Sequence, residues 1–148
     1  RYSDILLIWA EGVAADPDNH SADDLKQAYE YVNQIRRRGF GKDINTPDTG
    51  VDLETGDKNY LLEAIKDERP REPGFELLRK DDIVRWGEFY DRMRYARSLA
   101  AAIPDSYTSS YYVSARRTYN SVNRRDEIWP IPTYELGVNR ALVQNPGW

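Results

Sequence analysis

The sequence is short of the residues that most often carry catalysis or metal binding. None of its 148 residues is a cysteine, which excludes a disulfide, a thiolate nucleophile and a cysteine-based metal site. Its one histidine, His20, falls in a polar turn, where a surface residue is far commoner than a catalytic base. No glycine-rich phosphate loop, nucleophile elbow or pair of zinc ligands is present. Nucleophilic catalysis is therefore disfavoured, and we predict no cofactor and no metal.

Long apolar runs are also missing. No stretch approaches the roughly 18 consecutive apolar residues of a membrane-spanning helix, and no signal peptide is recognisable. Hydrophobic residues make up 40% of the chain and charged residues 31%, which is typical of a soluble folded domain. The net charge of −4 gives no electrostatic reason to expect a nucleic-acid partner.

Charged residues are numerous, but their patterns match no known site. The loop 41–58 holds several acids without the alternate spacing, central glycine and terminal glutamate of an EF-hand, so a solvated loop is favoured over a calcium site. Two carboxylates would suffice for a glycosidase, but the number of acids alone is no evidence for one. The arginines at 36–38 and 124–125 are candidates for phosphate contacts, and helix-end charges and internal ion pairs are the favoured interpretation.

Apolar residues recur at helical spacing in four segments of the chain. This periodicity predicts helices over residues 2–15, from the Ser21 cap to 39, over 59–68, and over 81–102 with Asp82 as a plausible cap. Asp24 is a capping-box partner for Ser21, and Asp57 is the expected cap of the third helix. The expected inward stripe of the first helix comprises Ile5, Leu6, Ile8, Trp9, Gly12 and Val13.

Two prolines interrupt the helical pattern after the third segment. Pro70 and Pro73 would each cost about 3 kcal/mol inside a helix, so the third helix is predicted to break or kink near Arg69. Phe75 and Leu78 are then expected to return to the core. The short connection between the first two helices predicts an antiparallel hairpin of about the length of a tetratricopeptide unit.

The fold expected from these segments is all-α. It consists of antiparallel, tetratricopeptide-like helix pairs with long irregular segments and an extended, proline-rich C-terminal tail. The length predicts a single domain over residues 1–148. Within the tail, a short helix is expected to begin with Thr133 as its cap.

Aromatic side chains stand out, with 11 tyrosines and 4 tryptophans. The segment 104–127 shows no evident helical period, and it holds Tyr107, Tyr111 and Tyr112 among serines, threonines and arginines. Two interpretations remain open. The rings could stack on the apolar faces of sugars, or they could pin a long irregular segment to the helices. These three tyrosines are the predicted ligand-binding residues.

Four blocks of the sequence carry a recognisable pattern: RYSDILLIWAE at residues 1–11, AYEYVNQIRRR at 28–38, the segment 67–87, and the C-terminal segment 129–148. In this order they resemble those of the SusD/RagB family of Bacteroidetes outer-membrane nutrient-binding lipoproteins. Residues 1–11 (RYSDILLIWAE) resemble its RYA-[ED]-VLLMYAEA helix, and residues 28–38 (AYEYVNQIRRR) its A-x4-[IV]-N-x-[IV]-R-x-R run. Residues 67–87 resemble its [DE]-ER-x-RE-LxFE-G-x-R-xx-DL-[IV]-RWG block. The last block joins WPIP at 129–132, EL at 135–136 and QNPGW at 144–148. This chain departs from the family pattern at Pro73-Gly74 and at Leu77, which replaces a glycine.

The resemblance implies a helical fold and a chain that is the C-terminal part of a longer, non-enzymatic lipoprotein. It implies a place on the extracellular face of the outer membrane, held by an N-terminal lipid. There the protein would bind oligosaccharides, or sometimes peptides, for a SusC-like TonB-dependent transporter in polysaccharide utilisation. The alternative is a helical protein–protein interaction scaffold that binds no sugar. No sugar-contacting residue carries over from the family blocks.

Overall fold

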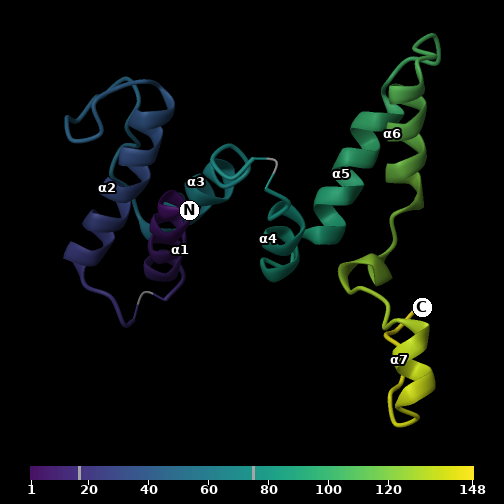
Figure 1. Ribbon diagram of the computed structural model, residues 1–148. Coiled ribbons are helices and arrows are strands. Elements are labelled where there is room, and N and C mark those ends of the chain that lie inside the picture. Colours follow the sequence, from purple (N-terminus) through teal and green to yellow (C-terminus); the bar gives the residue numbers. More distant parts are fainter. Residues whose placement is uncertain (17, 75) are drawn as a thin grey trace. The chain divides into compact units, whose positions relative to one another are not determined.

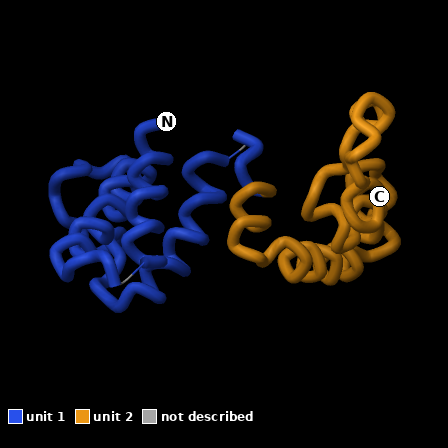
Figure 2. The backbone as a smooth tube through the Cα atoms, turned by 90° about the horizontal axis from the view of Figure 1, so that it is seen from below, with its two compact units in different colours: residues 1–79 blue, residues 80–148 orange. Residues whose placement is uncertain are grey.

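The computed structural model describes residues 1–16, 18–74 and 76–148, and these residues form helices joined by turns and loops (Figure 1). Phe75, which was predicted to return to the core, lies outside the described residues. No strand occurs in the described part of the chain, which confirms the all-α prediction. The chain divides into two compact units, residues 1–79 and 80–148 (Figure 2). The single domain remains a prediction.

The first unit is built on an antiparallel helix hairpin. Helices α1 (Tyr2–Ala15) and α2 (Ala22–Gly39) pack along each other, and α3 (Lys58–Glu68) lies against α1 (Figure 1). Burial of apolar side chains between these helices is the main stabilising contribution. The core comprises Leu6, Leu7, Ala10, Val13, Ala14, Ala28, Tyr29, Val32, Ile35, Leu61 and Ile65.

The prediction of which residues of α1 face inward is largely wrong. Leu6 and Val13 are buried as predicted, whereas the side chains of Ile5 and Ile8 are 60% and 50% exposed. Apolar residues surround most of this helix, so a second stripe at Leu6, Ala10 and Val13 has helical spacing as well. The helix turns that stripe inward, because α2 and α3 both pack on it.

Side-chain caps form at the N-termini of α2 and α3, as predicted. The Ser21 hydroxyl accepts the amide of Asp24 at 3.1 Å, and the Asp24 carboxylate accepts the amide of Ser21 at 2.8 Å. This capping box satisfies two backbone donors that the helix itself leaves unpaired. The Asp57 carboxylate accepts the amide of Tyr60 at 2.9 Å and caps α3 in the same manner.

Helix α3 ends at Glu68, and Arg69 is its C-terminal cap. Turns occupy residues 69–74, and the next helix begins only at Arg79. The predicted break near Arg69 is therefore confirmed, as the steric restriction imposed by Pro70 and Pro73 requires. Leu78 is half-buried.

The second unit carries more helices than the sequence predicted. In place of one helix over 81–102, α4 (Arg79–Arg85) and α5 (Phe89–Ala101) are separated at Gly87, whose φ of +71° is incompatible with a right-handed helix. Asp82 is not a cap. It lies inside α4, buried, and its carboxylate accepts two hydrogen bonds from Arg85 at 3.0 and 3.2 Å.

The expected irregular segment over 104–127 contains a helix. Helix α6 (Ser110–Ser121) packs on α5, and a short 3-10 helix, η1 (Arg124–Glu127), follows (Figure 1). The half-buried residues of α6 are Tyr112, Val113, Ala115, Arg116 and Tyr119. Three of these five are tyrosine or arginine, whose long side chains can bury apolar parts and expose polar ends, so the amphipathic pattern is weak in the sequence.

The C-terminal tail is held by side-chain amides. The Gln144 amide bonds both the N–H and the C=O of Ile131, at 2.8 and 2.9 Å, and Asn145 donates to the carbonyl of Trp129 at 2.7 Å. Helix α7 (Thr133–Val138) lies between these two partners in sequence. Thr133 is its first residue rather than its cap, because Pro132 occupies the cap position without a side-chain bond.

Candidate functional site

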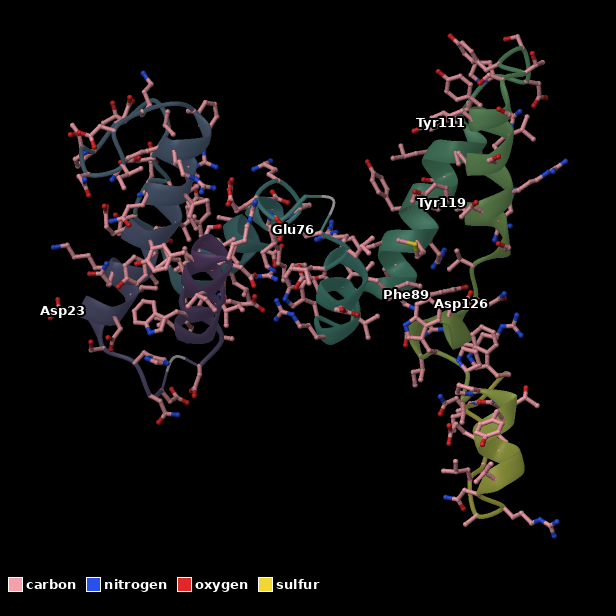
Figure 3. All side chains as sticks on the ribbon, viewed as in Figure 1. Asp23, Glu76, Phe89, Tyr111, Tyr119 and Asp126 are labelled. Atoms are coloured by element: carbon pink, nitrogen blue, oxygen red, sulfur yellow. The ribbon has the colours of Figure 1, made fainter. Side chains whose placement is uncertain are left out.

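The three predicted tyrosines lie where the chain turns from α5 into α6. Helix α5 ends at Ala101, and Pro104 begins a turn in which its carbonyl accepts the amide of Tyr107 at 3.0 Å. Tyr111 and Tyr112 follow in the first turn of α6, and Tyr111 is marked in Figure 3. The turn therefore brings a loop residue next to two helix residues.

The rings form one contiguous cluster. The ring centroids of Tyr107 and Tyr112 are 5.2 Å apart with their planes tilted by 48°, and those of Tyr111 and Tyr112 are 5.7 Å apart, edge to face. Such arrangements are favourable for aromatic pairs. Tyr112 is half-buried in the middle, whereas Tyr107 and Tyr111 are 51% and 77% exposed.

Arg116 fixes the turn that carries the cluster. Its guanidinium donates to the carbonyls of Ile103 and Pro104 at 3.2 and 3.4 Å, and lies 3.5 Å from the Asp105 carboxylate. These bonds go to carbonyls of the loop that follows α5. The loop between the two helices is thus tied to α6 one turn beyond Tyr112.

The cluster offers both apolar faces and polar groups to a ligand. None of the three tyrosine hydroxyls forms a hydrogen bond within the described residues, and two of the rings are largely open to solvent. A ring that served only to pin the segment would be covered, and Tyr111 is not. Flat apolar rings with available hydroxyls suit a ligand that has apolar faces edged by polar groups.

The charged residues near the helix ends are used for internal ion pairs, as predicted. Arg36 pairs with Glu68 at 3.1 Å, linking α2 to α3, and Arg69 pairs with Asp4 of α1 at 3.0 Å. Glu72 pairs with Arg1 and Arg38, and these partners hold the pKa of Glu72 below its ordinary value although burial acts to raise it. These groups stabilise the scaffold.

Arg37 is the most buried of the charged groups, with only 1% of its side chain exposed. Its guanidinium bonds both oxygens of Asp52, at 2.7 and 2.5 Å, and both oxygens of Glu30, at 2.9 and 3.2 Å. It also donates to the carbonyl of Ile44 at 2.8 Å. Hydrogen bonds from Arg37 lower the pKa of Asp52. The loop 41–58 is therefore attached to α2 through Asp52 and the carbonyl of Ile44.

A second feature of the α5–α6 hairpin was not predicted. A shallow hollow of about 10 Å³, open to solvent, lies between the two helices. Its lining comprises Tyr90, Met93, Arg94, Arg97, Tyr119 and Val122. The sequence could not reveal it while residues 104–127 were treated as irregular, because the hollow exists only where α6 faces α5.

The outward face of α1 is a further exposed surface. Tyr2, Ile5 and Ile8 are 77%, 60% and 50% exposed, and Trp9 meets Tyr31 edge to face at 5.2 Å. Apolar patches of this kind mark contact surfaces. No helix in the described part of the chain is long and apolar enough to cross a membrane.

Comparison with known proteins gives concordant matches. The profile of the SusD family matches residues 1–148. A SusD-like protein from Formosa agariphila is 29% identical over 145 residues, which cover 98% of this chain and 23% of that protein. The crystal structure of a SusD homologue from Bacteroides thetaiotaomicron superposes with a TM-score of 0.80 at 30% identity, over 100% of this chain and 26% of that one. The chain thus spans about a quarter of each relative.

Proposed function

This chain belongs to the SusD family, and on that basis we propose that it takes part in non-enzymatic binding of oligosaccharides for nutrient uptake. The match of the family profile over the whole chain carries the proposal. We place the intact protein on the extracellular face of the outer membrane, held by a lipid, as the partner of a SusC-like TonB-dependent transporter. In this proposal the chain is the C-terminal part of a longer protein.

The cluster of Tyr107, Tyr111 and Tyr112 is the proposed contact surface. The exposed rings stack on the apolar face of a sugar, and the available hydroxyls exchange hydrogen bonds with its hydroxyl groups. Arg116 keeps the supporting turn in place, so little ordering is needed on binding. No bond is made or broken. The ligand is then released to the transporter.

The test is a glycan array probed with the intact protein and with a variant in which the three tyrosines are alanine. We expect the variant to lose binding while its thermal unfolding temperature stays close to that of the wild type. Loss of thermal stability with unchanged affinity would instead show that the rings only hold the segment in place.

The second candidate function is a protein-interaction scaffold without sugar binding. The exposed apolar side chains of Tyr2, Ile5 and Ile8 on α1 favour it. Complete absence of binding to sugars and peptides on the same arrays would favour the scaffold over the binding protein.

A further inference from the structure

Positive charge is concentrated in the α5–α6 hairpin. Residues 89–121 hold five arginines and two carboxylates, Asp91 and Asp105, and they contain no lysine or glutamate. This formal charge of +3 contrasts with the net charge of −4 for the whole chain. Such a local excess creates a positive potential that attracts anions even when the protein as a whole is acidic.

Two of these arginines line the hollow between the helices. Arg94 and Arg97 lie one turn apart on α5, so their side chains emerge on the same side of the helix. Both are exposed, and neither has a hydrogen-bond or ion-pair partner among the described residues. Their donors are therefore available to a ligand, unlike those of Arg37, which are used inside the protein.

Aromatic rings and a third arginine complete the surroundings of the hollow. Tyr90 and Tyr119, the latter marked in Figure 3, line it from α5 and α6. The guanidinium of Arg124 lies 4.5 Å from the centroid of the Tyr90 ring. A guanidinium held on an aromatic face loses little freedom when it bonds an anion.

We propose that the exposed guanidinium groups at the mouth of this hollow bind the anionic substituent, a sulfate or a carboxylate, of an acidic oligosaccharide. Arg94 and Arg97 provide the charge-assisted bonds, which planar guanidinium groups form bidentately with such oxygens. The inference rests on the proposed function and narrows its ligand from sugars in general to anionic sugars.

The hollow and the tyrosine cluster are placed to act on one ligand. Tyr112 of the cluster and Tyr119 of the hollow are seven residues apart on α6, and both belong to its half-buried face. Seven residues of helix span about 10 Å. One end of a short acidic oligosaccharide would stack on the tyrosine cluster while its anionic group lies against Arg94 and Arg97 at the mouth of the hollow.

Three polymers that share one backbone test this proposal in the intact protein: dextran, dextran sulfate and carboxymethyl dextran. The test variant is Arg94→Gln/Arg97→Gln. Its matched control is Arg117→Gln/Arg140→Gln, which removes the same charge from two exposed arginines of this unit that do not line the hollow. Circular dichroism establishes that both variants are folded.

We expect a charged polymer to bind at least about tenfold more tightly than dextran, and more weakly as salt rises. The test variant should lose about tenfold or more of that affinity, and the control less than about twofold. Dextran sulfate and carboxymethyl dextran distinguish sulfate from carboxylate as the preferred group.

Equal losses of affinity in the test and control variants would contradict a specific site at Arg94 and Arg97, because they would show a diffuse electrostatic attraction. Equal affinity for dextran and its charged derivatives would overturn the inference while leaving oligosaccharide binding in place. Tighter binding of a single-stranded DNA oligonucleotide than of dextran sulfate would also overturn it. Failure of the proposed function is a separate result, namely no binding to any neutral or acidic glycan on an array.

Discussion

Replacement of Arg37 by methionine should destabilise the first unit strongly. The methionine keeps the apolar length of the side chain and removes a guanidinium that is 1% exposed. Removal of one partner from a buried ion pair costs about 3–5 kcal/mol, because the other partner is left without compensation. The two carboxylates differ in this respect, since 37% of the Glu30 side chain is exposed but only 13% of that of Asp52.

Glu30 can regain water when the guanidinium is removed, whereas Asp52 and the carbonyl of Ile44 lose most of their compensation. We therefore expect a loss near the lower limit, about 3 kcal/mol in the free energy of unfolding. Urea denaturation followed by circular dichroism measures it. Arg38→Met is the control, because this side chain is 56% exposed and its partner Glu72 keeps a second partner, Arg1, so its loss should cost about 1 kcal/mol or less. A loss below about 1 kcal/mol for Arg37→Met would refute the reasoning.

Three further predictions concern stability. Ser21→Ala removes the hydroxyl that accepts the Asp24 amide and should lower the free energy of unfolding, measured by urea denaturation, by about 1 kcal/mol. A stability equal to that of the wild type would contradict the capping role. Gly87→Ala should cost about 1–2 kcal/mol because φ is +71° there, although open space surrounds the site; an unchanged stability would show that the turn rearranges freely. The pKa of Asp52 is lowered from 3.8, so its stabilising contribution is complete above about pH 5 and is lost as the pH falls below 3.8. Asp52→Asn should flatten this loss in acid denaturation, and an unchanged pH profile would contradict the assignment.

The first unit could be predicted well from sequence, because its signals are local. Ser21 and Asp57 cap helices, and Pro70 and Pro73 end one, through contacts within a few residues. The buried face of α1 could not be predicted, since Ile5 and Leu6 are equally apolar and only the packing of other helices distinguishes them.

The second unit was harder to predict, because the half-buried face of α6 includes polar aromatic and cationic side chains. Tyr112, Arg116 and Tyr119 are half-buried on the helix that packs on α5, a pattern that hydrophobicity alone does not reveal. The tyrosine cluster was found by composition, and the structure brings its three members together. The hollow lined by Arg94 and Arg97 was missed, although the excess of arginine over acid in residues 89–121 was visible in the sequence.

The central claim is that the tyrosine cluster binds the sugar. Its most direct test is a calorimetric titration of the intact protein with an oligosaccharide that it binds on an array. Tyr111→Ala is compared with Tyr134→Ala, because these two side chains are 77% and 76% exposed and only Tyr111 belongs to the cluster. We predict that Tyr111→Ala weakens binding by about 1 kcal/mol, roughly fivefold, and that Tyr134→Ala leaves the affinity unchanged. Equal affinities for the wild type and Tyr111→Ala would contradict the claim that the tyrosine cluster binds the sugar.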